Sequence, residues 1–235
     1  MLQFLKQTTS DLLHLLYPNN CVTCSNALIG YENILCSKCE SELPHTNFWQ
    51  HADNPMAQRF WGRVPLKGAA ALYWFQKKDG VQQLIHQLKY KGKTDVGNYI
   101  GNKMAFALKS DNCIIPTPDL IIPVPLHWKK EKVRGYNQCS FIAQGIAEKT
   151  GWPVAYNVLE RVLEKESQTK QKRFDRYGNV SNIFKLNSAV NLSDKHILLV
   201  DDVVTTGATA EACIQTLLQH PNIEVSFVAA AMAAR

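Results

Sequence analysis

The chain has 235 residues, of which 46% are hydrophobic, and a formal net charge of +6 at pH 7. This length suits one medium-sized domain with a small addition, and the hydrophobic content is sufficient for a packed core. The sequence lacks a run of about 18 apolar residues and a signal-peptide cleavage site, so we expect a cytoplasmic protein without a membrane span. Seven cysteines in such a protein favour a metal site or free thiols over disulfides.

Two Cys-x-x-Cys pairs follow a leucine-rich start, which is interrupted by Lys6 and Asp11 and ends at Pro18. We expect a helix there that docks the next module. Eleven residues separate the two pairs, and together they offer four thiolates, from Cys21, Cys24, Cys36 and Cys39. Four thiolates can surround one tetrahedral ion, and binding would fold a segment too small to bury its own core. We favour structural zinc over redox pairs or two disulfides. With four cysteines the shell is closed, so we assign no catalysis to it.

The remaining chain divides into a linker and a larger domain. Residues 46–66 are mixed and aromatic, and we interpret them as a linker between residues 1–45 and 67–235. In the larger domain, strands alternate with helices. We expect strands at 69–75, 119–124, 153–158 and from 224 onward, and helices at about 81–90, 95–109, 138–149 and 208–220. This alternation predicts an α/β protein with an open parallel sheet flanked by helices.

The most informative stretch is an apolar run, Ile197–Val200, followed by Asp201 and Asp202 and then by a hydroxyl-rich turn that opens a helix. Ligands of open α/β sheets bind at the carboxyl ends of such strands. Successive backbone N–H groups at a helix N-terminus can surround a phosphate, and Gly207 permits close approach. The turn that would do so consists of Thr205, Thr206, Gly207, Ala208 and Thr209. The two carboxylates would repel a phosphate alone but suit hydroxyl groups or a magnesium ion. A ribose 5-phosphate meets both demands, whereas the alternative is an ordinary strand–loop–helix with two solvated aspartates.

A second buried strand also runs into a charged loop, residues 125–137. Its cations are Lys129, Lys130, Lys132 and Arg134. In a phosphoribosyl-binding interpretation this loop neutralises a diphosphate and its magnesium ion. Arg134 is the best candidate for bidentate contact, with Lys132 or Lys130 as point charges. We interpret His127 as a polar loop histidine rather than as an acid or base.

Basic residues gather in three windows, 77–93, 129–134 and 161–176, which hold more than half of the 26 lysines and arginines. If they converge on one rim they suit a polyanion, and the alternative is three solvated faces. Residues 161–177 lie between two short strand-like pieces, 158–162 and 180–186. We interpret them as a mobile lid that brings Arg173 and Arg176 to phosphates, with a disordered loop as the alternative.

The run from His196 to Thr209 resembles the 5-phosphoribosyl-1-pyrophosphate (PRPP) binding signature of type I phosphoribosyltransferases. With the 123–138 loop, Leu88–Gly92 and the four cysteines in this order, nearly the whole chain resembles the ComF (ComFC/GntX-like) family. The resemblance implies a zinc ribbon followed by a phosphoribosyltransferase-like domain. It implies zinc on Cys21, Cys24, Cys36 and Cys39, and Mg-PRPP on Asp201, Asp202, Thr205, Thr206, Gly207 and Thr209. It further implies natural competence, with imported single-stranded DNA and helicase-like and recombination-mediator proteins as partners.

Two functions are therefore considered. The first is a competence protein that binds PRPP and handles single-stranded DNA, with cations along the DNA backbone and aromatic rings that stack on bases. Its expected nucleic-acid contacts are Lys129, Lys130, Lys132, Arg134, Arg173 and Arg176. The second is a magnesium-dependent phosphoribosyltransferase acting on an unidentified base or amine. In it Asp201 and Asp202 hold the ribose diol, and Arg134 with Lys132 stabilises the leaving diphosphate. We favour the first function, because no base-recognising hood is visible in the sequence.

Overall fold

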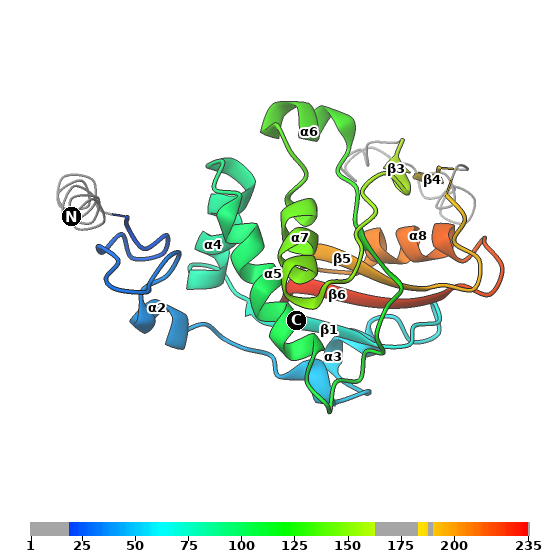
Figure 1. Cartoon of the computed structure of the whole chain (residues 1–235), viewed down its shortest axis with the longest axis horizontal. Coiled ribbons are helices and arrows are strands. Elements are labelled where there is room, and N and C mark those ends of the chain that lie inside the picture. Colours follow the sequence, from blue (N-terminus) through cyan, green and yellow to red (C-terminus); the bar gives the residue numbers. More distant parts are fainter. Residues whose placement is uncertain (1–18, 163–182, 188–189, 235) are drawn as a thin grey trace, which may run out of the picture.

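A computed structural model describes residues 19–162, 183–187 and 190–234. Its centre is a sheet of four parallel strands in the order β1-β6-β5-β2 (Figure 1). These strands are β1 (Ala69–Phe75), β6 (Glu224–Ala233), β5 (His196–Val204) and β2 (Leu120–Pro123). Their residues are mostly apolar and buried on both faces rather than alternating, as expected for parallel strands that are covered on both sides. The predicted open parallel sheet is confirmed.

Two strand predictions differ from the structure. The predicted strand 153–158 contributes a single parallel bridge, between Val154 and Ile121 at the edge of the sheet. Strand β5 does not end with the apolar run at Val200 but continues to Val204. The reason is β6, whose Ala229 and Ala231 remain paired with Asp201 and Val203. Both aspartates therefore lie on a rigid strand rather than on a loop.

Helices flank the sheet where the sequence predicts them. These are α4 (Gly80–Tyr90), α5 (Asp95–Leu108), α7 (Gln138–Thr150) and α8 (Ala208–Leu217). Helix α7 begins at Asn137, whose side chain accepts a hydrogen bond from the Cys139 N–H. Helices α5 and α7 touch at backbone distance, because a Cβ on Gly101 would lie 2.1 Å from the Ile142 carbonyl oxygen. This contact fixes α7, and with it the loop before α7, against the sheet.

The charged loop 125–137 contains a helix that we did not predict, α6 (Trp128–Arg134), shown above the sheet in Figure 1. It is capped by the His127 side chain, which accepts from the Lys129 N–H, and it ends at Gly135 with φ of +85°. None of its residues is buried. The sequence therefore shows no apolar stripe by which the helix could be recognised.

Residues 46–66, which we interpreted as a linker, pack on the sheet. They contain η1 (Phe48–Gln50) and α3 (Pro55–Gln58). The Asn54 side chain caps α3 and donates to the Ala69 carbonyl oxygen of β1. Phe60 is buried, and its ring lies 5.4 Å from that of Phe227 in β6. The segment thus carries core contacts as well as the connection.

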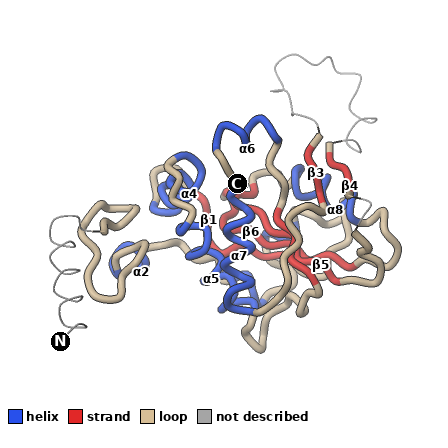
Figure 2. The backbone as a smooth tube through the Cα atoms, turned by 45° about the horizontal axis from the view of Figure 1, so that its top comes forward, coloured by secondary structure: helices blue, strands red, loops and turns tan. Residues whose placement is uncertain are grey.

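Two small modules extend from the sheet (Figure 2). Before it lie the four cysteines and α2 (Ser37–Ser41), whose Glu40 forms an ion pair with Lys103 of α5. After α7, β3 (Leu159–Arg161) pairs antiparallel with β4 (Phe184–Leu186), within the two short pieces predicted as strand-like. The predicted N-terminal helix and most of the predicted lid, with Arg173 and Arg176, lie outside the described residues.

Candidate functional site

Two buried carboxylates stand next to each other near the end of β5. The Asp201 Oδ1 atom accepts from the Asp202 N–H at 2.8 Å and lies 3.5 Å from the Cys139 Sγ atom of α7. Asp202 instead forms an ion pair at 2.8 Å with the Nζ atom of Lys89, near the end of α4.

Burial and the neighbouring charges shift the pKa values of Asp201 and Lys89. Burial, followed by repulsion from Asp202, raises the pKa of Asp201 from 3.8 to about 7. Burial alone would lower the pKa of Lys89, but attraction by Asp202 outweighs burial and the pKa is raised. Because the folded protein keeps the Asp201 proton longer than the unfolded chain does, ionising Asp201 costs stability as the pH rises from about 4 to about 7.

The turn after β5, residues 205–209, forms a small polar cavity at the start of α8; we call it the Thr-Gly loop. The cavity measures about 160 Å³ and is lined by Asp201 and residues 203–210. Gly207 stands at the N-cap of α8 with φ of +80°, so an L side chain would be strained there. The N-terminal residues of α8 thus open onto the cavity. Such a backbone arrangement can bind an anion without any cationic side chain.

Residues 59–63 contact the Thr-Gly loop and the first turn of α8. The sequence analysis predicted the loop but not these contacts. The Arg63 Nη1 atom donates to the Thr206 carbonyl oxygen at 3.2 Å, and Arg63 also forms an ion pair with Glu211 in the first turn of α8. A Cβ on Gly207 would lie 3.1 Å from the Phe60 ring. These contacts join positions more than 140 residues apart, so no local signal in the sequence reveals them.

A cavity of about 530 Å³ lies between the end of α4 and α6; we call it the cationic cavity. It is lined by Lys89, Tyr90, Gly92, Lys129, Lys130, Val133, Arg134 and Tyr136. The Arg134 guanidinium lies 5.4 Å from the centre of the Tyr90 ring, and the Tyr136 hydroxyl donates to the Leu88 carbonyl oxygen. Lys89 connects the cationic cavity to Asp202.

The structure therefore brings together residues from two of the three basic windows. Lys129, Lys130 and Arg134 line the cationic cavity, whereas Lys132 is not among its lining residues. In the third window, Arg161 lines a different cavity. We did not assign Lys89 to the site. The only indication in the sequence was that Lys89 belongs to the Leu88–Gly92 run. Its ion pair with Asp202 of β5 depends on the folded structure.

The four predicted metal ligands converge at the other end of the described chain. The Sγ atoms of Cys21, Cys24, Cys36 and Cys39 all lie within 4.8 Å of one another, and those of Cys24 and Cys36 are 3.7 Å apart. Zn–S bonds of ~2.3 Å in a tetrahedron place sulfur atoms ~3.8 Å apart, so the residues fit one such ion. Burial alone would raise the pKa of Cys21, but hydrogen bonds from the backbone of Cys24, Cys36 and Thr23 lower it to about 6. A thiolate, the form that binds metal, is thereby favoured at Cys21, whereas burial raises the pKa of Cys39.

Together, the parallel sheet, the Thr-Gly loop after β5 and the paired acids define a phosphoribosyltransferase-like fold with an N-terminal four-cysteine module compatible with a zinc ribbon. Relatives named for competence and DNA utilization support the resemblance to the ComF family. The chain is 28% identical to Competence protein F of Haemophilus influenzae, over 90% of this chain and 89% of that protein. It is 25% identical to Competence protein ComFC of Bacillus subtilis, over 92% of this chain and 86% of that protein.

Two further similarities cover less of the chain. DNA utilization protein YhgH of Salmonella typhi is 30% identical over 58% of this chain, and the match spans only 60% of that protein. Among solved structures, adenine phosphoribosyltransferase of Leishmania tarentolae is 12% identical over 65% of this chain and 74% of its own, with a TM-score of 0.40. At that TM-score the likeness carries no weight beside the strand order itself. No family model matches the sequence. Among the described residues, no helix combines the length and hydropathy needed to cross a membrane.

Proposed function

We propose that this protein binds PRPP and handles single-stranded DNA during natural transformation. The observation that carries the proposal is the position of Lys89. Lys89 lines the cationic cavity and pairs with Asp202, and the neighbouring Asp201 lines the cavity of the Thr-Gly loop. A phosphate loop, hydroxyl acceptors and a cluster of cations therefore lie next to one another. The relatives named for competence and DNA utilization support the biological part of the proposal.

The residues suit the three parts of PRPP. The 5-phosphate would be bound by the backbone N–H groups of the Thr-Gly loop, including Thr205, Thr206, Gly207, Ala208 and Thr209. The ribose hydroxyls would donate to Asp201 and Asp202. The diphosphate would lie toward Arg134 and Lys89, with Lys132 as a more distant charge. Magnesium would enter with the diphosphate, since carboxylate and phosphate oxygens are its preferred ligands, and neutralise charge there.

Single-stranded DNA would use the same cationic cavity from outside. Lys129, Lys130 and Arg134 offer charges for the backbone, and Tyr90 and Trp128 are 67% and 58% exposed, so both can stack on bases. Arg173 and Arg176 remain expected contacts outside the described residues. As the family resemblance implies, such a protein would work in the cytoplasm with helicase-like and recombination-mediator proteins.

We further propose that residues 1–45 bind structural zinc. Residues 67–235 would form the phosphoribosyltransferase-like domain, and residues 46–66 would connect the two. The closed set of four cysteines leaves no coordination position for a substrate. The zinc module would therefore stabilise the fold rather than catalyse a reaction.

Replacing Asp202 by asparagine tests the PRPP site. We expect Asp202→Asn to weaken Mg-PRPP binding at least about tenfold, since a charged acceptor for the ribose hydroxyls is lost. Isothermal titration calorimetry measures the affinity, and thermal melting verifies that the variant is folded. Asp111→Asn, at an exposed aspartate outside the site, is the matched control. Equal affinity of the folded Asp202→Asn variant and the wild type would refute the placement of the ribose.

A second candidate function is transfer of the phosphoribosyl group to a base or amine. It is favoured by the two buried carboxylates, because fixed negative charge stabilises a ribosyl cation as the diphosphate leaves. Arg134 and Lys132 would hold the departing diphosphate. Release of pyrophosphate from Mg-PRPP, dependent on an added base or amine, would establish this activity.

A further inference from the structure

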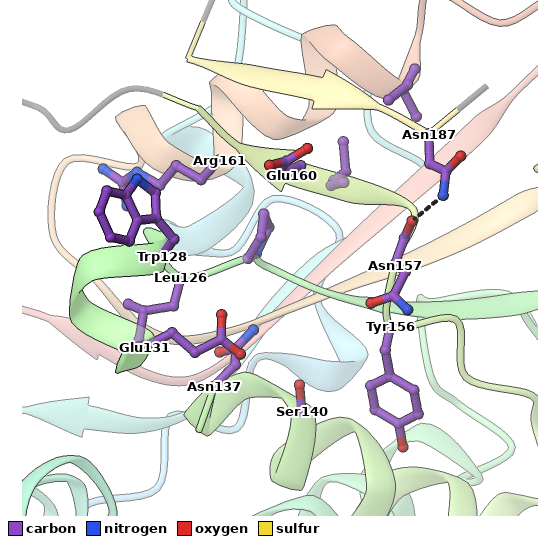
Figure 3. A pocket seen from close by; sticks show the side chains of 13 residues that line it. Leu126, Trp128, Glu131, Asn137, Ser140, Tyr156, Asn157, Glu160, Arg161 and Asn187 are labelled. Atoms are coloured by element: carbon purple, nitrogen blue, oxygen red, sulfur yellow. Dashed lines mark hydrogen bonds between the residues drawn. The ribbon is translucent and has the colours of Figure 1, made fainter. Parts of the chain in front are cut away.

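A second cavity, of about 560 Å³, lies on the other side of α6, between that helix, the start of α7 and the β3–β4 hairpin (Figure 3). We call it the amide-lined cavity. Its lining residues are Pro125, Leu126, Trp128, Glu131, Asn137, Ser140, Tyr156, Asn157, Leu159, Glu160, Arg161, Leu186 and Asn187. The proposed PRPP site does not use it. Its volume falls within the usual range for small-ligand sites, and a nucleoside fits that range.

Helix α6 separates two chemically different cavities because its residues alternate with helical spacing. Trp128 and Glu131, three positions apart, line the amide-lined cavity. Lys129, Lys130, Val133 and Arg134 line the cationic cavity instead. The two sides are in contact through the Lys129 Nζ atom, which lies 5.8 Å from the centre of the Trp128 ring. A nucleic-acid strand whose phosphates lie on one side of α6 can therefore place a base on the other side.

The amide-lined cavity is unsuited to a phosphate. Its charged lining residues are Glu131, Glu160 and Arg161, so carboxylates outnumber cations. Arg161 is held by the Phe184 ring, 5.6 Å from its guanidinium carbon. A phosphate placed here would meet like charges and would find four cations in the cavity next to it.

The same lining suits a nucleobase. Trp128 is 58% exposed and Tyr156 is 48% exposed, so two aromatic rings at the cavity edge can offer a face for stacking. Asn157 carries an amide, and Ser140 a hydroxyl, that can pair with the edge of a base. The amides of Asn137 and Asn187 instead donate to the carbonyl oxygens of Val124 and Asn157 and hold the cavity wall in place. Figure 3 shows Trp128, Glu160, Asn137 and Asn157 placed around the cavity on different elements. Carboxylates such as Glu160 accept hydrogen bonds from the amino groups of bases.

We propose that the amide-lined cavity binds one unstacked base of single-stranded DNA, whose flanking phosphates lie in the cationic cavity across α6. This inference rests on the proposed DNA handling and adds to it the place where a base is recognised. Trp128 stacks on the base, and the Asn157 amide and the Ser140 hydroxyl pair with its edge. Helix α6 has no buried residue, so it does not contribute to the core. In this proposal its role is to separate the base from the phosphates.

Fluorescence anisotropy with two labelled strands of equal length, a thymidine homopolymer and an abasic strand, tests this inference. The wild type is expected to bind the base-bearing strand roughly 5-fold to 160-fold more tightly, the range of one base–aromatic stack. Trp128→Ala should lose most of this preference while the salt dependence of binding stays unchanged. Trp128→Phe should retain it, and Trp61→Ala, at an equally exposed tryptophan that does not line the cavity, should match the wild type.

A substitution on the other side of α6 completes the design. Lys130→Ala should weaken both strands equally and reduce the salt slope by about 0.7, because one phosphate contact is lost. If both strands bind equally to the wild type, or if Trp128→Ala keeps the preference, the base site is refuted while DNA handling stands. If neither strand binds even at low salt, DNA handling itself is refuted.

Discussion

The purified protein is expected to contain one zinc ion per chain, and removing the zinc is expected to unfold the four-cysteine module while the parallel sheet stays folded. Between residues 19 and 45 the buried apolar side chains are few: Cys21, Val22, Leu35, Cys39 and Leu43. A core of this size cannot offset the entropy of ordering the segment, whereas structural zinc contributes an apparent ~10–16 kcal/mol in comparable peptides. The metal is therefore the main source of stability in this module.

Elemental analysis and trypsin digestion measure this result. Lys38 is the one basic residue between positions 19 and 45, so cleavage after Lys38 reports unfolding of the module. Chelator treatment or Cys21→Ser should make Lys38 cleavable, and Cys113→Ser, at a cysteine outside the cluster, should not. Protein without zinc that still resists cleavage at Lys38 would show that the cysteines do not hold a structural metal.

Lys89→Met is expected to destabilise the fold by about 2–3 kcal/mol at pH 8. The substitution removes the ammonium group that pairs with Asp202 and leaves this buried carboxylate beside a second one on Asp201. This value lies below the range of about 3–5 kcal/mol for breaking a fully buried ion pair, because 21% of the Lys89 side chain is exposed to water. The loss should be smaller at pH 5, where a proton on Asp201, whose pKa is raised to about 7, leaves one uncompensated charge instead of two.

Urea denaturation at the two pH values measures both effects. Lys91→Met, at an exposed lysine two positions further on, should change stability by less than about 0.5 kcal/mol. Lys89→Arg, which keeps the charge, should restore most of the stability at pH 8. A loss of equal size at pH 5 and pH 8 would contradict the assignment of Lys89 as the counter-ion of the β5 carboxylates.

Most elements could be predicted because their side chains carry a local pattern. Helix α4 has its buried stripe at Val81, Leu84, Ile85 and Leu88, and β5 begins as an uninterrupted apolar run. Helix α6 has no such pattern, since none of its residues is buried and its charged side chains face two cavities. The end of β5 depends on pairing with β6, which no local window contains.

The candidate site was predictable in part for the same reason. The Thr-Gly loop and the paired acids are contiguous in sequence, so the sequence alone indicates a site for a phosphate and hydroxyl groups. Lys89 and Arg63 act over long separations: one reaches Asp202 from α4, and the other reaches Thr206 from the segment before β1. The four cysteines were recognisable because metal ligands follow short, fixed spacings.

The measurement that tests the central claim most directly is the anisotropy of labelled single-stranded DNA titrated with this protein, with and without Mg-PRPP, over a series of salt concentrations. We expect binding that weakens steeply with salt, because cations of the cationic cavity release counterions from the DNA. We also expect Mg-PRPP to change the affinity, because Lys89 belongs to both the acid pair and that cavity. Absence of DNA binding at low salt, with or without Mg-PRPP, would contradict the account and leave phosphoribosyl transfer as the function to pursue.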